Sequence, residues 1–264
     1  MNRLSACLVI LAIAAIAISA CSSTPETVDD ATAALEDSNA YQQGHQAMEQ
    51  GRWEEASQFY GQAADEAPQN WSAHLNHAIA LTRDESFRQG LEAFGRALEQ
   101  GGEDEAIVYY NLGNLYQAWA RYDLSIDPYR TALALSDDPD LSFDAILNLS
   151  ASLSFINALD DAHRALDDAQ QMRPDDPRPQ LTRGVVLQHQ DRSPEALELY
   201  DALLSAHPDY VAAHFHRAYV LMRLERHQEA LEGFQTYLAQ APDGDYRSQA
   251  ESHISTLELQ IRRR

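Results

Sequence analysis

The chain has 264 residues, of which 45% are apolar, and this composition is that of a folded protein rather than of a disordered chain. Only eleven glycines and ten prolines occur, and long stretches rich in Ala, Leu, Glu, Gln and Arg favour helix over strand, so we expect an all-α fold. The formal net charge is −22, and so acidic a surface repels DNA and RNA, so we expect no nucleic-acid partner.

Both cysteines of the chain, Cys7 and Cys21, lie near its N-terminal end. They cannot join distant parts of a fold from there, so we expect neither a structural disulfide nor a cysteine-based metal site. Residues 1–20 instead predict a secretory signal peptide, because Arg3 is followed by an apolar run from Leu8 to Ile18. This run is about half as long as the roughly 20 residues that a transmembrane helix needs.

The predicted signal ends in a short motif at Ile18, Ser19, Ala20 and Cys21. This tetrad resembles the lipobox of bacterial lipoproteins. The resemblance implies a diacylglyceryl group on the Cys21 thiol, cleavage before Cys21 and acylation of the new amino group, which together would hold the protein to a bilayer. Ser22 follows the cysteine in place of Asp, and by resemblance to Gram-negative sorting this favours the outer membrane, with the fold facing the periplasm. An ordinary signal peptide that is cut before a cysteine is the alternative.

Residues 21–36 are predicted to form the lipidated cysteine and a solvated tether, because they are small, polar and acidic. At about 3.3 Å per residue, such a tether reaches at most about 50 Å. Partners would therefore have to come close to the membrane.

From residue 37 to residue 244 the sequence repeats with a period near 34, the length of a helix–turn–helix repeat. The six predicted repeats are residues 37–70, 71–104, 106–139, 143–176, 177–210 and 211–244. Positions 8 and 20 of every repeat are small, which lets two helices cross closely. These residues are Gly44, Ala78, Gly113, Ser150, Gly184 and Ala218 at position 8, and Ala56, Gly90, Ser125, Ala162, Ala196 and Ala230 at position 20.

This pattern resembles the tetratricopeptide repeat family over more than three quarters of the chain. The resemblance implies a right-handed solenoid of about six helix–turn–helix repeats. Position 24 is large in every repeat, as the groove between the helices requires: Tyr60, Phe94, Tyr129, Leu166, Tyr200 and Phe234. Residues 245–264 carry Ile254, Leu257 and Ile261 at helical spacing, so we expect a capping helix that covers the last repeat.

In this family the first helix of each repeat lines the concave surface, and that surface usually binds a peptide. Carrying over the groove positions gives a largely apolar and aromatic set: Tyr41, Leu75, Ile79, Tyr110, Asn114, Leu147, Leu181, Val185, Phe215 and Tyr219. Aromatic side chains at such a surface favour protein recognition. Packing between neighbouring repeats is the alternative role for several of them. A clamp for a partner's C-terminal carboxylate is not expected, because the lysines of that clamp are absent.

No pattern in the sequence indicates an enzyme or a metal site. The pairs His74 with His77 and His214 with His216 lack a convergent third ligand, and the acidic pairs such as Asp175 with Asp176 lack the spacing of a calcium loop. There is no nucleophile elbow, phosphate-binding glycine loop or zinc-protease motif. We therefore expect no catalysis, no metal and no cofactor.

Two functions remain open from the sequence. The first is a lipid-anchored scaffold or adaptor that binds other envelope proteins, in pilus or secretin, outer-membrane or peptidoglycan machinery. The second is a lipoprotein that captures a small ligand or glycan, to which the aromatic side chains of Trp53 or Trp119 would contribute. The sequence does not predict the partner or the oligomeric state.

Overall fold

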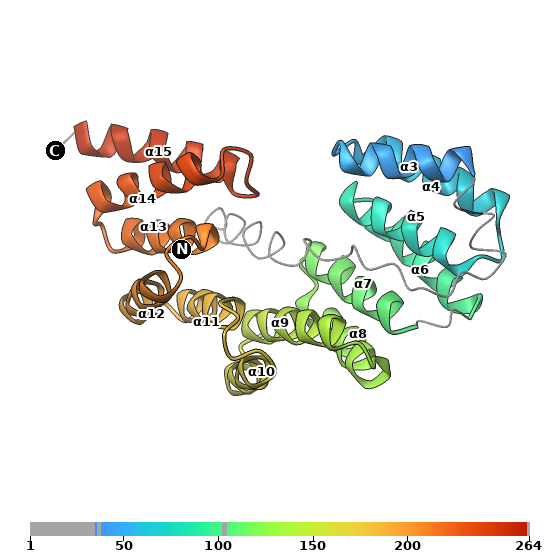
Figure 1. Cartoon of the computed structure of the whole chain (residues 1–264), viewed down its shortest axis with the longest axis horizontal. Coiled ribbons are helices and arrows are strands. Elements are labelled where there is room, and N and C mark those ends of the chain that lie inside the picture. Colours follow the sequence, from blue (N-terminus) through green and yellow to red (C-terminus); the bar gives the residue numbers. More distant parts are fainter. Residues whose placement is uncertain (1–34, 36–37, 102–104, 263–264) are drawn as a thin grey trace. The chain divides into compact units, whose positions relative to one another are not determined.

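The computed structural model describes Leu35, residues 38–101 and residues 105–262 (Figure 1). The predicted signal peptide, Cys21 and most of the tether lie outside these residues. Within them, thirteen helices and no strand occur. The helices are α3 (Asn39–Glu49), α4 (Trp53–Glu66), α5 (Trp71–Arg83), α6 (Phe87–Glu99), α7 (Glu105–Ala118), α8 (Tyr122–Leu135), α9 (Pro139–Phe155), α10 (Leu159–Met172), α11 (Arg178–His189), α12 (Ser193–Ala206), α13 (Val211–Arg223), α14 (His227–Gln240) and α15 (Arg247–Arg262).

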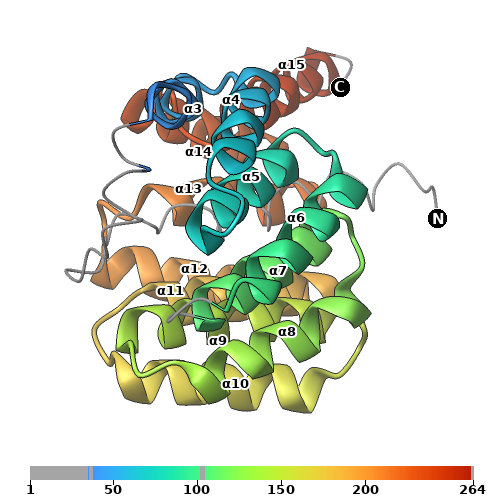
Figure 2. The ribbon, with the colours of Figure 1, turned by 90° about the vertical axis from the view of Figure 1, so that its right-hand side faces the viewer.

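The described residues form two compact bodies. The N-terminal body runs to Asn148 and contains α3 to α8 and the first part of α9, and the C-terminal body runs from Leu149 and contains the end of α9 and α10 to α15. Within the N-terminal body each helix from α3 to α8 contacts the next one in the chain (Figure 2). The same holds from α10 to α15 in the C-terminal body. The predicted all-α architecture of stacked helix pairs is therefore confirmed.

The turn inside each helix pair has the same backbone conformation in all six repeats. Its central residue, at position 15, has a positive φ: Gly51 (68°), Glu85 (58°), Ala120 (57°), Asn157 (64°), Asp191 (57°) and Glu225 (58°). The turn closes the first helix with two backbone bonds, which in the third repeat are Ala120 N–H to Gln117 O (2.9 Å) and Arg121 N–H to Tyr116 O (2.8 Å). These bonds satisfy carbonyl groups that the helix end would leave free.

Proline ends the second helix in four of the six repeats. The residue before each proline leaves helical geometry, with φ and ψ of −127° and 65° at Ala67, −137° and 83° at Arg173, −131° and 73° at His207, and −134° and 73° at Ala241. A following proline disfavours helical geometry at such a residue, so the helix must stop there. The second and third repeats, which lack this proline, stop differently: α6 is followed by Gln100 and by Gly101 with φ of 65°, and α8 ends at Leu135 and is followed by the extended residue Ser136.

Small residues on the first helix lie directly against the large residue at position 24 of the same repeat. A Cβ atom added to Gly113 would stand 2.5 Å from Cε1 of Tyr129, and one added to Gly44 would stand 2.8 Å from Cδ1 of Tyr60. All six side chains at position 24 are at most 2% exposed. Burying a side chain of this size contributes about 1.5–3 kcal/mol. The packing expected from positions 8 and 24 is therefore present.

The last helix covers the end of the C-terminal body. α15 buries Ala250 and Leu257 and half-buries Ile254 and Ile261, while its exposed residues are polar apart from Leu259. The hydroxyl of Tyr237 accepts a hydrogen bond from the N–H of Tyr246 (2.9 Å), which fixes the chain as it enters α15. Residues 140–142, which separate the third and fourth predicted repeats, form part of the first turn of α9.

Replacement of Gly113 by Ala tests the close approach of helices within a repeat. The added methyl group must displace the fully buried Tyr129 ring, so we expect a loss of about 1–3 kcal/mol in the free energy of unfolding. Urea unfolding followed by tryptophan fluorescence measures it. The matched control is Gly95→Ala, since nothing lies within 4 Å of a Cβ at that position and the change should stabilise α6 by up to about 1 kcal/mol. Equal effects of the two substitutions would contradict the packing account.

Candidate partner-binding surface

Six of the ten predicted groove residues are buried. These are Leu75, Tyr110, Leu147, Leu181, Val185 and Phe215, each at most 5% exposed. Tyr41, Ile79, Asn114 and Tyr219 are half-buried. The structure therefore shows a packing role for the first group, and direct contact of any of the ten with a partner stays a prediction.

Position 5 of the repeats supplies most of the buried group, and its contacts explain why. The Tyr110 hydroxyl accepts a hydrogen bond from Nδ2 of Asn148 in the following repeat (3.3 Å). The Phe215 ring stacks on that of Tyr246 with centroids 4.4 Å apart and an interplanar angle of 14°. Leu75 belongs to the apolar cluster formed by α5, α6 and α7. These side chains join one repeat to the next.

Asn114 and Asn148 are also held by their neighbours. Oδ1 of Asn114 accepts hydrogen bonds from the hydroxyl of Tyr129 (2.8 Å) and from Nδ2 of Asn148 (3.0 Å). The backbone carbonyl of Asn148 in turn accepts a bond from Nε2 of Gln117 (3.2 Å). Burial raises the pKa of Tyr129 well above its usual value, so its hydroxyl keeps its proton and remains the donor. This network holds α7, α8 and α9 together within the N-terminal body.

The half-buried residues leave part of their surface open. Tyr41 contacts the rings of His45 (4.7 Å) and Tyr60 (5.5 Å), and its hydroxyl accepts a bond from Asn76 (3.1 Å). Tyr219 contacts His253 of α15 through the rings, 5.7 Å apart. The exposed part of such apolar and aromatic side chains can be buried against a partner without burying polar groups of this protein.

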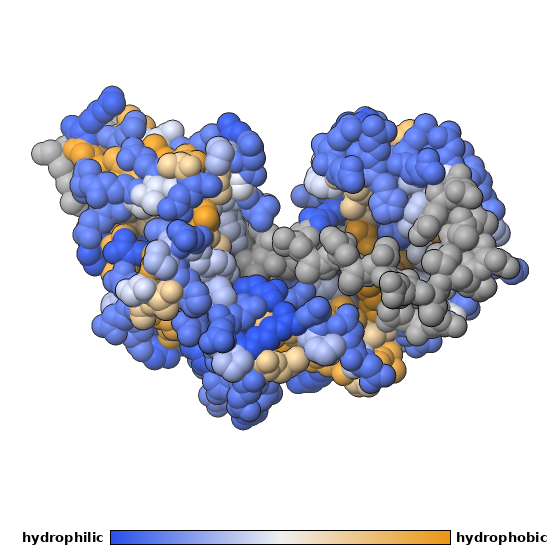
Figure 3. Space-filling model, in the orientation of Figure 1, coloured by the Kyte–Doolittle hydropathy of each residue, from blue (hydrophilic) through white to orange (hydrophobic). Residues whose placement is uncertain are grey.

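Charge is distributed unevenly between the first and the second helices of the repeats. α5, α11 and α13 contain no Asp or Glu, whereas every second helix contains at least two. The arginines of α11 and α13 are ion-paired: Arg183 with Asp167 (2.7 Å), Arg217 with Asp201 (2.5 Å) and Arg223 with Asp191 (2.6 Å). The first helices therefore add little net charge, and most of the −22 lies elsewhere. Figure 3 shows hydrophilic residues over most of the visible face, with apolar residues in smaller patches.

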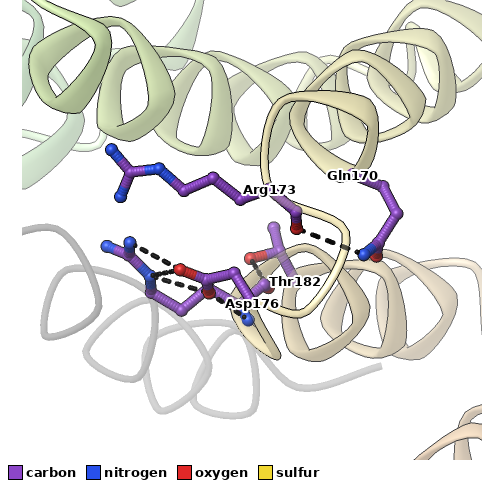
Figure 4. Close-up of polar contacts among 5 residues, drawn as sticks. Gln170, Arg173, Asp176 and Thr182 are labelled. Atoms are coloured by element: carbon purple, nitrogen blue, oxygen red, sulfur yellow. Dashed lines mark hydrogen bonds and ion pairs between the residues drawn. The ribbon is translucent and has the colours of Figure 1, made fainter.

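The turn between α10 and α11 shows what its acidic residues do (Figure 4). Oδ1 of Asp176 accepts bonds from the N–H (2.9 Å) and Nε (3.0 Å) of Arg178, and Oδ2 accepts one from Nη2 (2.8 Å). Burial alone would raise the pKa of the Asp176 carboxyl, but the hydrogen bonds and charge of Arg178 hold that pKa below its usual value. Nε2 of Gln170 donates to Pro174 O (2.6 Å) across the same turn. Asp176 is therefore a turn-stabilising residue.

One histidine of each pair and two of the tryptophans have local partners. Nε2 of His74 and of His214 each lies near the carbonyl oxygen of a proline six residues earlier, at 2.9 and 3.1 Å. Among the described residues, no group of three or more His, Cys, Asp or Glu could hold a metal ion. Trp119 stacks on Phe87 (5.6 Å), and the Arg83 guanidinium lies over the Trp53 ring (5.7 Å).

Leu35 lies inside the range predicted as tether, yet it is 2% exposed. It packs with Ala40 of α3, Ala63 and Ala64 of α4, and Ala73 of α5. Its one signal in the sequence is an apolar side chain in a polar acidic segment. The N-terminal body therefore begins before the first predicted repeat.

Replacement of Tyr110 by Phe separates the packing role of this residue from partner contact. The ring remains, but the hydrogen bond with Asn148 is lost, so we expect a loss of about 1 kcal/mol in the free energy of unfolding of the N-terminal body. Tryptophan fluorescence during urea unfolding measures it. Tyr109→Phe is the control, because this half-buried neighbour has no hydrogen bond through its hydroxyl to another described residue, and its effect should stay within about 0.5 kcal/mol. If the Tyr110→Phe protein is as stable as the control, the hydroxyl of Tyr110 does not help to join its repeat to the next one.

Comparison with solved structures gives folds of the same kind. A tetratricopeptide repeat protein from Parabacteroides merdae aligns with a TM-score of 0.61 and 15% identity over 79% of this chain and 80% of its own. PilW, a type IV pilus biogenesis factor, aligns with a TM-score of 0.60 and 19% identity over 80% of this chain and 96% of its own. PilF of Pseudomonas aeruginosa aligns with a TM-score of 0.58 and 15% identity over 85% and 99%. At these identities the likeness shows the fold alone.

No curated protein sequence is significantly similar to this one. The family comparison, by contrast, covers most of the repeat region. Tetratricopeptide repeat profiles match residues 41–87, 157–209 and 181–245, and a second profile of the same description matches residues 106–139. Together with the stacked helix pairs and the small residues at positions 8 and 20, these matches show that the chain belongs to the tetratricopeptide repeat family.

Proposed function

We propose that this protein is a lipid-anchored adaptor of the bacterial envelope, which binds other proteins through the first helices of its repeats and catalyses no reaction. The observation that carries the proposal is the combination, in one chain, of a lipobox-like tetrad ending in Cys21 and a tetratricopeptide repeat fold with little charge on its first helices. The domain order follows: signal peptide at 1–20, lipidated cysteine and tether from 21, repeats over 37–244, and capping helix over 245–264.

Anchoring rests on the sequence of the N-terminus and on where the fold begins. Among the described residues, no helix combines the length and the apolar character needed to cross a bilayer. Acyl chains on Cys21 would supply the attachment instead, because each buried CH₂ contributes about 0.8 kcal/mol and two chains hold a protein stably. Since Leu35 is already packed in the N-terminal body, about 13 residues separate it from Cys21, a reach of roughly 45 Å. The repeats would work close to the outer membrane, on its periplasmic side.

The partner class follows from the surface. The first helices offer half-buried apolar and aromatic groups, among them Ile79 of α5 and Tyr219 of α13. Such groups suit a polypeptide partner better than a charged small ligand. PilW is a type IV pilus biogenesis factor, and its similar fold makes pilus or secretin assembly one candidate setting, beside outer-membrane and peptidoglycan machinery.

The anchor is tested by replacing each cysteine in turn. Cys21→Ser should abolish the incorporation of radiolabelled palmitate and move the protein from the membrane to the soluble periplasmic fraction, because no other thiol follows the cleavage site. Cys7→Ser is the matched control and should keep both labelling and membrane attachment. Palmitate on the Cys21→Ser protein, or loss of label from the Cys7→Ser protein alone, would refute lipidation at Cys21.

The binding surface is tested with a photo-crosslinking amino acid at residue 79 or residue 219 in intact cells. We expect each to capture a defined envelope protein, since both side chains lie on first helices and are partly open. Residues Gln62 on α4 and Gln235 on α14 are exposed control positions on second helices and should not capture it. Ile79→Asp together with Tyr219→Ala should then lower the yield of that partner at least tenfold. Capture from the control positions alone would place the binding surface on the second helices.

A further inference from the structure

Histidine side chains distinguish the C-terminal body from the N-terminal one. Seven of the ten histidines lie beyond residue 149. Two of them, His189 and His216, each have a buried Nε2 atom without a hydrogen-bond partner. An imidazole so placed can take up a proton only by putting a charge where nothing stabilises it.

His216 lies in the core of the C-terminal body and is 2% exposed. Its ring faces Tyr200 of α12 (5.9 Å) and Tyr246 before α15 (5.3 Å), whose phenol groups are neutral because burial raises the pKa of both. Burial, with no contribution from a charged neighbour, lowers the pKa of His216 to about 3.

The repeat register explains why this nitrogen has no partner. His216 occupies position 6, where Asn76 and Asn148 each donate a hydrogen bond to the tyrosine at position 5 of the preceding repeat. In the repeat before His216 that position is Leu181, which has no polar atom on its side chain. The preceding repeat therefore offers His216 no hydroxyl at the position that accepts the bond from Asn76 and Asn148.

His189 at the end of α11 has a different but equally unfavourable setting for charge. Its Nδ1 lies 3.1 Å from Oγ of Ser154, and its ring lies 4.1 Å from that of Phe155. The charged group that faces it is Arg223 of α13, which is paired with Asp191. Burial, and then the positive charge of Arg223, lower the pKa of His189 to about 4.

Because of these surroundings of His189 and His216, the C-terminal body should lose stability as the pH falls. Both folded-state pKa values lie below the usual value of 6.5, so the unfolded chain binds protons first as the pH falls. The stabilisation is complete above about pH 6.5 and is lost progressively below it, by up to about tenfold in the unfolding constant per pH unit and histidine. Between pH 7 and pH 5 each histidine should raise that constant roughly 30-fold.

The N-terminal body has fewer such groups. His45 is exposed, and Nε2 of His74 lies 2.9 Å from Pro68 O, although Nδ1 of His74 and of His77 is buried without a hydrogen-bond partner. His77 is the comparable group: burial, Arg96 and His74 lower its pKa, while Asp65 acts in the opposite direction. The acid response should therefore be weaker there.

We propose that the C-terminal body is an acid-sensitive half of this protein, which opens when His189 and His216 take up protons while the N-terminal body stays folded. Acidification of the surroundings would then withdraw the partner surface of α11 and α13 and leave that of α3, α5 and α7. The device depends on the described fold and not on the lipid anchor.

The distribution of tryptophan allows a direct test on the full chain in nonionic detergent. Trp53, Trp71 and Trp119 all lie in the N-terminal body, so their emission reports on that body, whereas far-UV circular dichroism reports on both. In urea titrations at pH 7.0 and pH 5.0, we expect the additional transition seen by circular dichroism to move to lower urea at pH 5.0 and the tryptophan transition to move much less. His216→Phe should remove about 30-fold of the pH effect on the unfolding constant.

His214→Phe is the matched control on the same helix, because His214 is partly exposed and should leave the pH effect unchanged. The proposal is overturned if His216→Phe retains the full pH effect, or if both transitions shift equally. Should His216→Phe fail to fold at pH 7.0, the imidazole nitrogen shifts of the wild-type protein decide by NMR. A neutral His216 ring in the folded protein at pH 5 supports the proposal, and a protonated ring in the folded protein overturns it.

Discussion

The close approach of the two helices in each repeat is the constraint on which the rest of this structure depends. At Gly44, Gly113 and Gly184 there is no room for a Cβ beside the aromatic ring at position 24, so the ring lies directly against the first helix. With the two helices this close, the first helix of the next repeat can pack into the groove between them. The side chains at position 5 are then enclosed between repeats, which is why most of the predicted groove residues are buried. Only the side chains that remain exposed after the repeats have stacked are available to a partner.

Neighbouring repeats are joined differently in the two bodies. In the N-terminal body neutral hydrogen bonds join position 5 to position 6 of the next repeat, as between Tyr110 and Asn148. In the C-terminal body ion pairs join position 25 to position 7 of the next repeat, as between Asp201 and Arg217. In the N-terminal body the same two positions hold, for example, Gly61 and His77, which cannot form such an ion pair because glycine has no side chain. Partly exposed ion pairs weaken with salt, whereas neutral bonds do not, so ionic strength should act mainly on the C-terminal body.

The fold could be predicted from the sequence because the small and large residues recur at fixed positions, and each position has one packing role. Which of the groove residues are buried could not be predicted from the sequence, because this depends on the side chain that each one meets in the neighbouring repeat. Tyr110 and Tyr219 are both tyrosines on first helices, yet Tyr110 has Asn148 and Tyr129 beside it, while the ring of Tyr219 has the tilted ring of His253 beside it. Leu35 was missed for a related reason, since a single apolar residue in a polar segment has no periodicity. The unpartnered nitrogen of His216 could not be predicted either, because the ring neighbours Tyr200 and Tyr246 come from other helices or turns of the fold.

The left-handed residue in each turn has a consequence for how this chain can change over time. Only Gly51 among the six is a glycine, and residues such as Ala120 or Glu225 occupy a conformation that disfavours a side chain by roughly 1 kcal/mol. The side chain of Asp191 bonds Arg223 of the next repeat, whereas Ala120 has no polar side chain to lose, so a codon change to glycine at Ala120 would raise the stability of its repeat without removing an ion pair. Such a gain in stability could offset a destabilising but useful substitution elsewhere in the same repeat.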